Sequence, residues 1–335
     1  MGIMKTEHTE PSGGLLPDGM DAASSDLIDK VNAILLSLVP GSESPIELSR
    51  GLASDIFMGF AGPDFYPYIE TEDVKIPGAE DYLSARVYYH PKSAVRLSPL
   101  VLFLHGGGWS LAGLDEYDGL IKALAAQSGA NFISLDYRLA PENPFPAALN
   151  DSQAALNYIL ENAADFRGLA NKVAVMGDSA GGNLATVLAQ SPENSGTIQA
   201  QFLLYPMLDV FSPHATYPSR VLYGDGDYFL TRDALDVSVE NYGLTKELCK
   251  DPRVSPLFHT AMADLPPTYI IVGNCDPLRD EARTYAERLT KADVDVTLDC
   301  IPGAIHAFLS FGILDDVKTH RTRLAREIQR RLGSE

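Results

Sequence analysis

One serine in the sequence sits where it could act as a nucleophile. Ser179 lies in GDSAGG at 177–182, directly after the apolar run VAVM at 173–176 and before small residues with helical spacing. A strand, a sharp glycine-flanked turn and a helix form the setting in which G-x-S-x-G becomes a nucleophile elbow. The pentapeptide alone also fits a plain turn, so it is the flanking pattern that favours the elbow.

A serine nucleophile needs a base near neutral pH, and the base needs a carboxylate that orients it. In an open α/β sheet, such groups collect past the carboxyl ends of the strands. A strand predicted at 268–273 runs toward Asp276, the first acid after its end, with Asp280 as the second choice. An aspartate before a proline also caps helices, so the pattern leaves Asp276 open between an orienting carboxylate and a helix cap.

The base is predicted to be a histidine. Of the seven histidines, only His306 and His320 follow Asp276, as the chain order serine, acid, histidine requires. His320 stands among basic residues on a predicted terminal helix and is interpreted as a surface residue. His306 lies in a loop just past a strand predicted at 294–300. We therefore predict His306 as the base that activates Ser179.

Acyl transfer also needs hydrogen-bond donors for the oxyanion that develops on the substrate. One is expected from the amide of Ala180, directly after the nucleophile. Others should come from HGGG at 105–108, because three glycines after a predicted strand let backbone N–H groups turn inward. Glycines after a strand also cradle phosphates, but neither GxGxxG nor GxxxxGK[ST] is present and the following segment is acidic.

The elements that must position these groups alternate along the chain. Strands are predicted at 73–76, 84–89, 99–105, 131–136, 173–176, 199–205, 268–273 and 294–300, and helices at 115–128, 147–162, 281–291 and 316–331. Continuous apolar strands separated by helices predict an α/β fold, with a mostly parallel central sheet covered by helices on both faces.

Two segments stand outside this alternation. Residues 1–60 are expected to form an N-terminal cap, with a mobile lead-in to about residue 22 followed by a helix capped by Ser25 and a second helix at 46–60. Binding of this pair to a membrane is disfavoured, because Lys30 is the only base in the first helix. Residues 206–266 are too long for a connection and are expected to form an inserted lid with a helix at 233–242. The catalytic domain would then comprise 61–205 and 267–335.

Apolar residues of these segments, together with Trp109 beside the glycine loop and Tyr205 just before the lid, are candidates for the substrate pocket, although a plain core position is an equal alternative for each. The candidates are Phe57, Phe60, Trp109 and Tyr205, followed by Met58, Tyr223, Tyr228 and Phe229.

Composition narrows the partners and the location. A formal charge of −19 over 335 residues disfavours nucleic acid and anionic membrane surfaces. The three cysteines have no metal-like spacing. Cys275 and Cys300, in or beside apolar strand-like runs, are expected to be buried free thiols, which fits a reducing cytosol. We see neither a signal peptide nor an apolar stretch long enough to span a bilayer, so a cytoplasmic protein without membrane insertion is expected. A homodimer is left open.

Several motifs together resemble one family. HGGGW at 105–109, DYRLAPE at 136–142, GDSAGG at 177–182, DPLRDE at 276–281 and GxxHxF at 303–308 are similar to those of the hormone-sensitive-lipase-like esterases. These are the bacterial family IV carboxylesterases of the α/β-hydrolase superfamily, and the aspartate before the serine matches the GDSAG subgroup.

The resemblance implies a catalytic triad of Ser179, Asp276 and His306, and an oxyanion hole made by the amides of Gly107, Gly108 and Ala180. It also implies an N-terminal cap over the active site, His105 and DYRLAPE as scaffolding, and a buried structural pair between Arg138 and Glu142.

The predicted function is hydrolysis of short- to medium-chain carboxylic esters through an acyl-enzyme on Ser179. No metal or organic cofactor is expected, and the partner is a small-molecule ester. A lipase, an amidase or a deacetylase would use the same triad, and a noncatalytic ligand receptor on this fold would be expected to lack the base.

Overall fold

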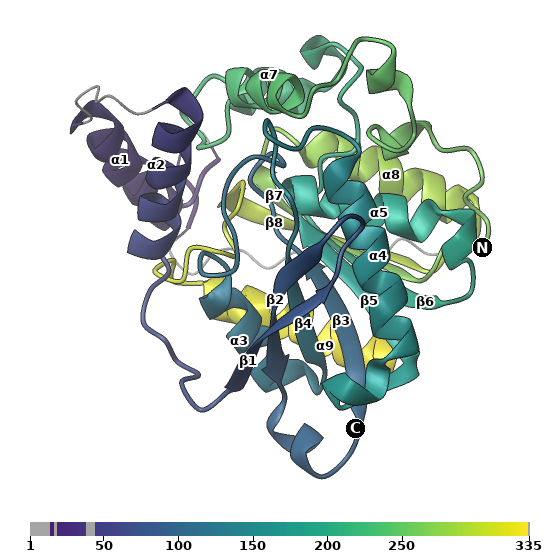
Figure 1. The fold of residues 1–335 in the computed structure, drawn as a ribbon. Helices are drawn as coiled ribbons and strands as arrows, with labels where there is room; N and C mark the ends of the chain where they lie inside the picture. The colour runs from purple at the N-terminus through teal and green to yellow at the C-terminus, as the bar shows by residue number, and fades with distance from the viewer. Residues whose placement is uncertain (1–13, 17–18, 38–43, 334–335) are drawn as a thin grey trace.

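The computed structural model describes residues 14–16, 19–37 and 44–333 (Figure 1). In these ranges the sheet has the strand order β1-β2-β4-β3-β5-β6-β7-β8, with β1–β2 and β2–β4 antiparallel and the remaining pairs parallel. The strands are β1 Glu70–Pro77, β2 Tyr82–Tyr89, β3 Ser98–Leu104, β4 Asn131–Asp136, β5 Gly168–Asp178, β6 Ile198–Leu204, β7 Thr268–Cys275 and β8 Val296–Ile305. The predicted mostly parallel α/β sheet is confirmed.

Helices cover both faces of this sheet (Figure 1). On one face α3 (Asp118–Ser128) packs against α9 (Val317–Leu332). On the other lie α4 (Ala147–Glu161), α5 (Ser179–Gln190) and α8 (Arg279–Lys291). The two-sided cover explains why β3 is buried at every position and reads as a continuous apolar run.

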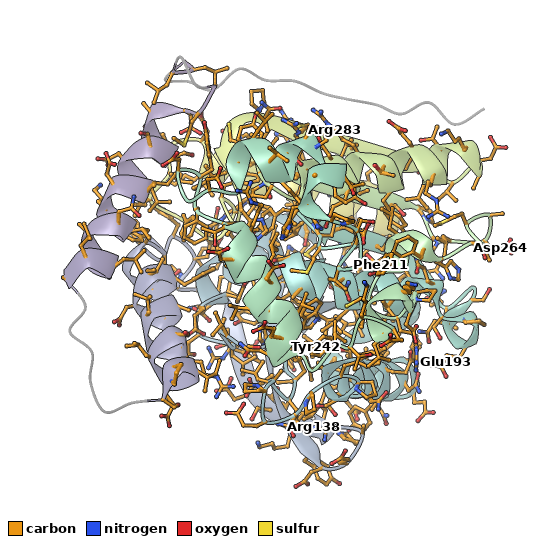
Figure 2. The ribbon with its side chains drawn as sticks, turned by 90° about the horizontal axis from the view of Figure 1, so that it is seen from above. Arg138, Glu193, Phe211, Tyr242, Asp264 and Arg283 are labelled. Carbon is orange, nitrogen blue, oxygen red and sulfur yellow. The ribbon has the colours of Figure 1, made fainter. Side chains whose placement is uncertain are left out.

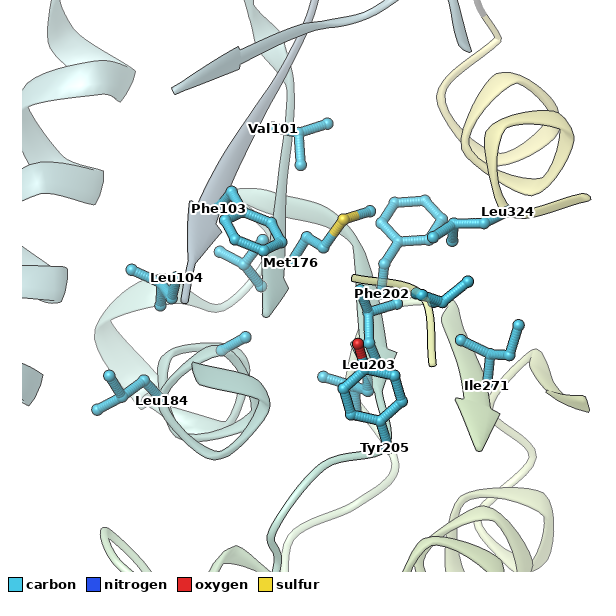
Figure 3. Close-up of a cluster of buried hydrophobic side chains, with 14 of the residues drawn as sticks. Val101, Phe103, Leu104, Met176, Leu184, Phe202, Leu203, Tyr205, Ile271 and Leu324 are labelled. Atoms are coloured by element: carbon cyan, nitrogen blue, oxygen red, sulfur yellow. The ribbon is translucent and has the colours of Figure 1, made fainter. Parts of the chain in front are cut away.

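The core joins neighbouring strands to the covering helices. Figure 3 shows Phe103 of β3, Met176 of β5 and Phe202 of β6 packed side by side, with Leu324 of α9 beyond Phe202. All four side chains are fully buried. This packing fixes the positions of the strand ends from which the candidate site residues project.

Four further helices lie outside the alternating part of the chain. They are α1 (Ala22–Ser37) and α2 (Pro45–Gly59) before the sheet, and α6 (Pro218–Tyr223) and α7 (Arg232–Asn241) between β6 and β7. In Figure 1, α7 lies at the top of the molecule and α2 lies at its upper left, beside α1. The division of the chain into a cap, a catalytic domain and a lid at the bounds given above stays a prediction.

The start of α1 differs from the expectation. The helix begins before Ser25, because the Asp21 carboxylate accepts hydrogen bonds from the backbone N–H and the hydroxyl of Ser24 at 2.7 and 2.8 Å. The predicted mobile lead-in lies mostly outside the described residues. Its described end packs on the body: Met20 is buried, and the Asp21 N–H donates to the Gly303 carbonyl at 3.1 Å.

The expected Arg138–Glu142 pair is wrong. Arg138 instead forms ion pairs with Asp151 and Glu80, both at 2.8 Å. Glu142 is exposed and pairs with Arg50 of α2. Asp151 is fully buried on α4, so the guanidinium of Arg138 is the partner that compensates its charge.

His320 is also not the surface residue that was expected. It is buried and meets the ring of Phe308 edge-on, with the ring centroids 5.5 Å apart. Positions 317, 320, 324 and 328 share the inner face of α9, so helical periodicity, not the basic neighbours, decides its burial. Burial lowers the pKa of His320. Cys275 and Cys300 are buried thiols, as expected, and Cys249 is also buried.

Within the described ranges, none of the helices combines the length and apolarity needed to cross a bilayer.

Candidate active site

Ser179 stands at the junction of β5 and α5 with a left-handed backbone, at φ +52°. The flanking glycines are required by close approach of the backbone. A Cβ on Gly177 would overlap the Gly181 carbonyl, and a Cβ on Gly181 would overlap the Leu104 carbonyl of β3. The strained turn presents the hydroxyl beyond the strand end, as the elbow prediction requires.

The structure brings together the three residues predicted to react. His306 Nε2 lies 3.1 Å from Ser179 Oγ, and His306 Nδ1 lies 2.8 Å from Asp276 Oδ2. Asp276 is fully buried, while Ser179 and His306 retain only slight exposure. The two contacts fix both ring nitrogens, so a neutral imidazole would donate from Nδ1 to Asp276 and accept from Ser179 at Nε2.

Asp276 combines the two roles that the sequence left open. Its Oδ2 faces His306, and its Oδ1 accepts the Leu278 N–H at 2.8 Å. The second contact closes the turn that leads into α8, which begins at Arg279 without a side-chain cap of its own. The local turn thus holds the carboxylate in the orientation that His306 needs. Asp280, the second choice, instead pairs with Arg279 and accepts the Ser219 N–H.

The glycine loop after β3 lies beside Ser179. Gly107 and Gly108 have φ of +99° and +58°, and both line the same cavity as Ser179. The N–H groups of Gly107 and Gly108 donate no hydrogen bond to any of the described residues. Ala180 is the second residue of α5, where the helix leaves N–H groups without intrahelical partners. Gly107 and Gly108 thus lie at the space next to the hydroxyl, and an oxyanion hole made with Ala180 stays a prediction.

Asp178 is a residue at this site to which the sequence analysis gave no role. Its Oδ1 accepts the Gly106 N–H at 2.6 Å and its Oδ2 accepts the Tyr117 hydroxyl at 2.9 Å. The buried carboxylate thus ties the nucleophile elbow to the glycine loop and to the segment before α3. Burial raises the pKa of Asp178 to about 7, although the Tyr117 and Gly106 donors oppose the rise. The acid inside GDSAGG was a usable signal for this contact, whereas nothing in the sequence pointed to Tyr117.

A cavity of about 420 Å³ opens above these groups. Its floor is Ser179, His306 and the glycine loop, and its walls come from α2 and α7. The α2 wall is apolar apart from Ser49 and is otherwise made by Ile46, Leu52, Ala53, Ile56 and Phe57. The cavity thus joins segments that are far apart in the sequence around the candidate nucleophile.

Of the predicted pocket residues, Phe57 and Phe229 line this cavity, and Trp109, Tyr205 and Phe60 do not. Trp109 stacks on Tyr242, with ring centroids 4.4 Å apart and a 5° interplanar angle. Figure 2 shows Tyr242 near the end of α7. Tyr205 is fully buried and meets the His306 ring edge-on at 4.9 Å, so it supports that loop from behind.

Phe60 follows the last residue of α2 and lies past the wall that this helix contributes. Met58, Tyr223 and Tyr228 also lie outside the cavity lining. Apolar character alone does not encode which of these side chains faces the cavity.

Known proteins resemble this chain over most of its length. Residues 101–310 match the family described as alpha/beta hydrolase fold. Carboxylic ester hydrolase LipN of Mycobacterium tuberculosis is 37% identical over 276 residues, which cover 80% of this chain and 71% of LipN. Carboxylesterase NlhH of the same organism is 38% identical over 261 residues, which cover 75% of this chain and 79% of NlhH.

A solved structure agrees with these relatives. The ester hydrolase from the metagenome of Lake Arreo has a TM-score of 0.85 at 33% identity, covering 95% of this chain and 99% of that one. These matches confirm the resemblance to the hormone-sensitive-lipase-like esterases, and they show that the chain belongs to the α/β-hydrolase family.

Proposed function

We propose that this protein is a serine carboxylesterase that hydrolyses short- to medium-chain esters through an acyl-enzyme on Ser179. The observation that carries the proposal is the unbroken contact series from Ser179 through His306 to Asp276, at 3.1 and 2.8 Å, on the floor of an apolar cavity. Relatives named as carboxylesterases support the same activity.

In the proposed mechanism, His306 Nε2 takes the hydroxyl proton as Ser179 Oγ attacks the ester carbonyl carbon. The imidazolium is stabilised by the Asp276 carboxylate and then gives its proton to the departing alkoxide. Water attacks the acyl-enzyme in the same way, with His306 again taking the proton. The carboxylic acid leaves and the serine hydroxyl is restored. No metal or organic cofactor takes part in these steps.

The N–H groups of Gly107, Gly108 and Ala180 are proposed to hold the tetrahedral oxyanion. They are fixed backbone donors, so little reorganisation is needed when charge develops on the carbonyl oxygen. Loss of one such donor typically lowers kcat by about 10²–10³-fold.

The apolar α2 wall and the limited volume of the cavity support small acyl and alcohol groups as substrates. A cytoplasmic location is part of the proposal and is supported by the buried free thiols. The formal charge of −19 supports a neutral ester over an anionic one. We leave a homodimer open.

The proposal is tested on p-nitrophenyl esters from acetate to palmitate. We expect Ser179→Ala to abolish hydrolysis and labelling by a serine-reactive phosphonate, and Asp276→Asn to lower kcat by about 10⁴-fold, the scale typical of the orienting carboxylate. Asp280→Asn is the matched control, because this second acid of the same segment faces Arg279 instead of His306.

Near wild-type hydrolysis by Ser179→Ala would refute Ser179 as the nucleophile. A preference for long-chain emulsions would favour a lipase, and turnover of matched anilides but not of esters would favour an amidase.

A further inference from the structure

The substrate cavity has one corner where its apolar lining is interrupted. Apart from the floor and Asp178 below it, its polar lining consists of Ser49, Ser110, Tyr117, Asp233, Ser238 and Asn241. Tyr117 is engaged with Asp178, and Ser49 donates to the Pro45 carbonyl of its own helix. Ser110, Asp233, Ser238 and Asn241 remain. Asp233 is a charged residue, and we call the three neutral ones, Ser110, Ser238 and Asn241, the Ser110 corner.

Ser110 is the unusual member of this corner. Its side chain is 2% exposed, and its hydroxyl has no hydrogen-bond partner among the residues that the structure describes. Leaving a buried hydroxyl unpaired costs about 1–3 kcal/mol. Ser110 also lines the cavity, so its hydroxyl is a donor and an acceptor beside the cavity that no described residue uses.

The other two residues line the same cavity as Ser110 and come from α7, which packs on the glycine loop. The chain neighbours of Ser110 and Asn241, Trp109 and Tyr242, stack ring on ring. Ser238 lies directly over Gly108. Its hydroxyl donates to the Ala234 carbonyl at 2.7 Å, which leaves only its lone pairs free.

The Asn241 side chain is half-buried, and its carboxamide makes no hydrogen bond to any of the described residues. The corner therefore offers a hydroxyl, a carboxamide and a further acceptor in a small space.

The corner is close to the place where the ester carbonyl would lie. The Ser110 N–H donates to the Gly107 carbonyl at 3.1 Å, within the same tight turn as the proposed oxyanion donors. Gly108 and Ser110 are two positions apart in the chain, so their Cα atoms lie at most about 7 Å from each other. A substrate group that reaches Ser110 is thus only a few bonds from the scissile carbonyl.

We propose that Ser110 and Asn241 bind a second oxygen atom of the substrate, as an ether, hydroxyl or carbonyl close to the ester. The preferred substrates would then be oxygen-substituted esters rather than plain hydrocarbon ones. The charge of the site favours a neutral group, because Asp233 also lines the cavity and would repel a free carboxylate. This inference rests on the proposed esterase activity.

The test uses ester pairs that differ by one oxygen in place of a methylene group. On the acyl side the pair is p-nitrophenyl methoxyacetate and p-nitrophenyl butyrate. On the alcohol side it is 2-methoxyethyl butyrate and butyl butyrate. For each pair, the ratio of kcat/KM for the oxygen-containing ester to that for the hydrocarbon ester is compared between wild type and variants, which cancels the intrinsic reactivity of each ester.

We expect Ser110→Ala to lower this ratio by roughly 3- to 10-fold for at least one pair, the scale of one neutral hydrogen bond. Asn241→Ala is expected to lower the ratio for the same pair. Ser134→Ala is the matched control, because Ser134 on β4 is also buried with an unpaired hydroxyl but lies outside the cavity lining.

Ratios for both pairs that stay unchanged or rise in Ser110→Ala would overturn the subsite while leaving the esterase proposal intact. Hydrolysis of none of the four esters by the wild type would refute the esterase proposal and the subsite together. A thermal melt of each variant checks the fold. Ser110→Ala is expected to melt no lower than wild type, because it removes an unpaired buried hydroxyl.

Discussion

Gly108→Ala is the sharpest test of the proposed oxyanion loop. Gly108 has φ +58°, a left-handed conformation that costs an alanine roughly 1–2 kcal/mol. The added Cβ would also overlap Ser238 Oγ and lie 2.9 Å from Ser238 Cβ. Neither α7 nor the loop accommodates both effects without moving. We therefore expect the Gly108 N–H to leave its position beside Ser179.

The magnitude follows from two contributions. Backbone strain alone, if it falls entirely on the active arrangement, lowers kcat by about 5- to 30-fold. Displacement of one oxyanion donor lowers it by about 10²–10³-fold. We expect the larger loss in kcat for Gly108→Ala, with little change in KM, because the donor acts on the transition state and not on the bound ester.

A second substitution separates the two contributions. Ser238→Gly removes the overlapping side chain, and the Ser238 Cα would lie 3.8 Å from the added Cβ, an ordinary contact. In the Gly108→Ala background it should recover kcat to within about 30-fold of Ser238→Gly alone, the limit set by strain. Gly107→Ala is the matched control, because its Cβ would overlap the backbone carbonyl of Leu111, which no side-chain deletion relieves.

The assay is p-nitrophenyl butyrate hydrolysis, with active sites counted by phosphonate titration. The reasoning fails if Gly108→Ala keeps more than a tenth of the wild-type kcat. It also fails if Ser238→Gly rescues Gly107→Ala as well as it rescues Gly108→Ala.

Three further predictions concern charges around the site. Because folding raises the pKa of Asp178 to about 7, an unfolded Asp178 releases its proton near pH 4 while the folded one keeps it. The free energy of unfolding of wild type, measured by urea titration, should therefore fall by up to about 4 kcal/mol relative to that of Asp178→Asn as the pH rises from 4 to 8. Unfolding free energies of the two proteins that change in parallel with pH would contradict this. Glu281→Ala leaves the Arg220 guanidinium buried without its carboxylate and should destabilise the fold by about 3–5 kcal/mol, most of which Arg220→Met should restore; a loss below 1 kcal/mol in urea would refute it. Arg50→Met should lower the melting temperature more than Glu142→Gln, which neutralises only its exposed carboxylate partner, because Arg50→Met also removes the donors to two backbone carbonyls. Equal shifts of the two melting temperatures in calorimetry would argue against this difference.

The parts of the fold that depend on local pattern were predictable. Strand 131–136 and the elbow at Ser179 follow from apolar runs and glycines that act over a few residues. Strand ends and chain order led to Asp276 and His306, which the structure places 2.8 Å apart, since the carboxyl ends of parallel strands meet at one edge of the sheet.

Contacts between distant segments were not predictable in the same way. Arg138 and Glu142 stand four residues apart, but Arg138 pairs with the buried Asp151 on α4 and Glu142 pairs with Arg50 of α2. Trp109 adjoins the glycine loop in sequence, yet its ring turns away to stack on Tyr242. In each case the outcome is decided by which partner the tertiary structure offers, and no local spacing carries that information.

The glycine loop is held from three directions by elements that also shape the cavity. Asp178 holds the Gly106 N–H from the elbow, Ser238 of α7 abuts Gly108, and Arg50 of α2 donates to the Ser110 carbonyl at 2.9 Å. The walls that meet the substrate therefore bear directly on the N–H groups proposed to hold the oxyanion. A movement of α2 or α7 large enough to admit a bulkier ester would also shift those donors, so selection by size should appear in kcat as well as in KM.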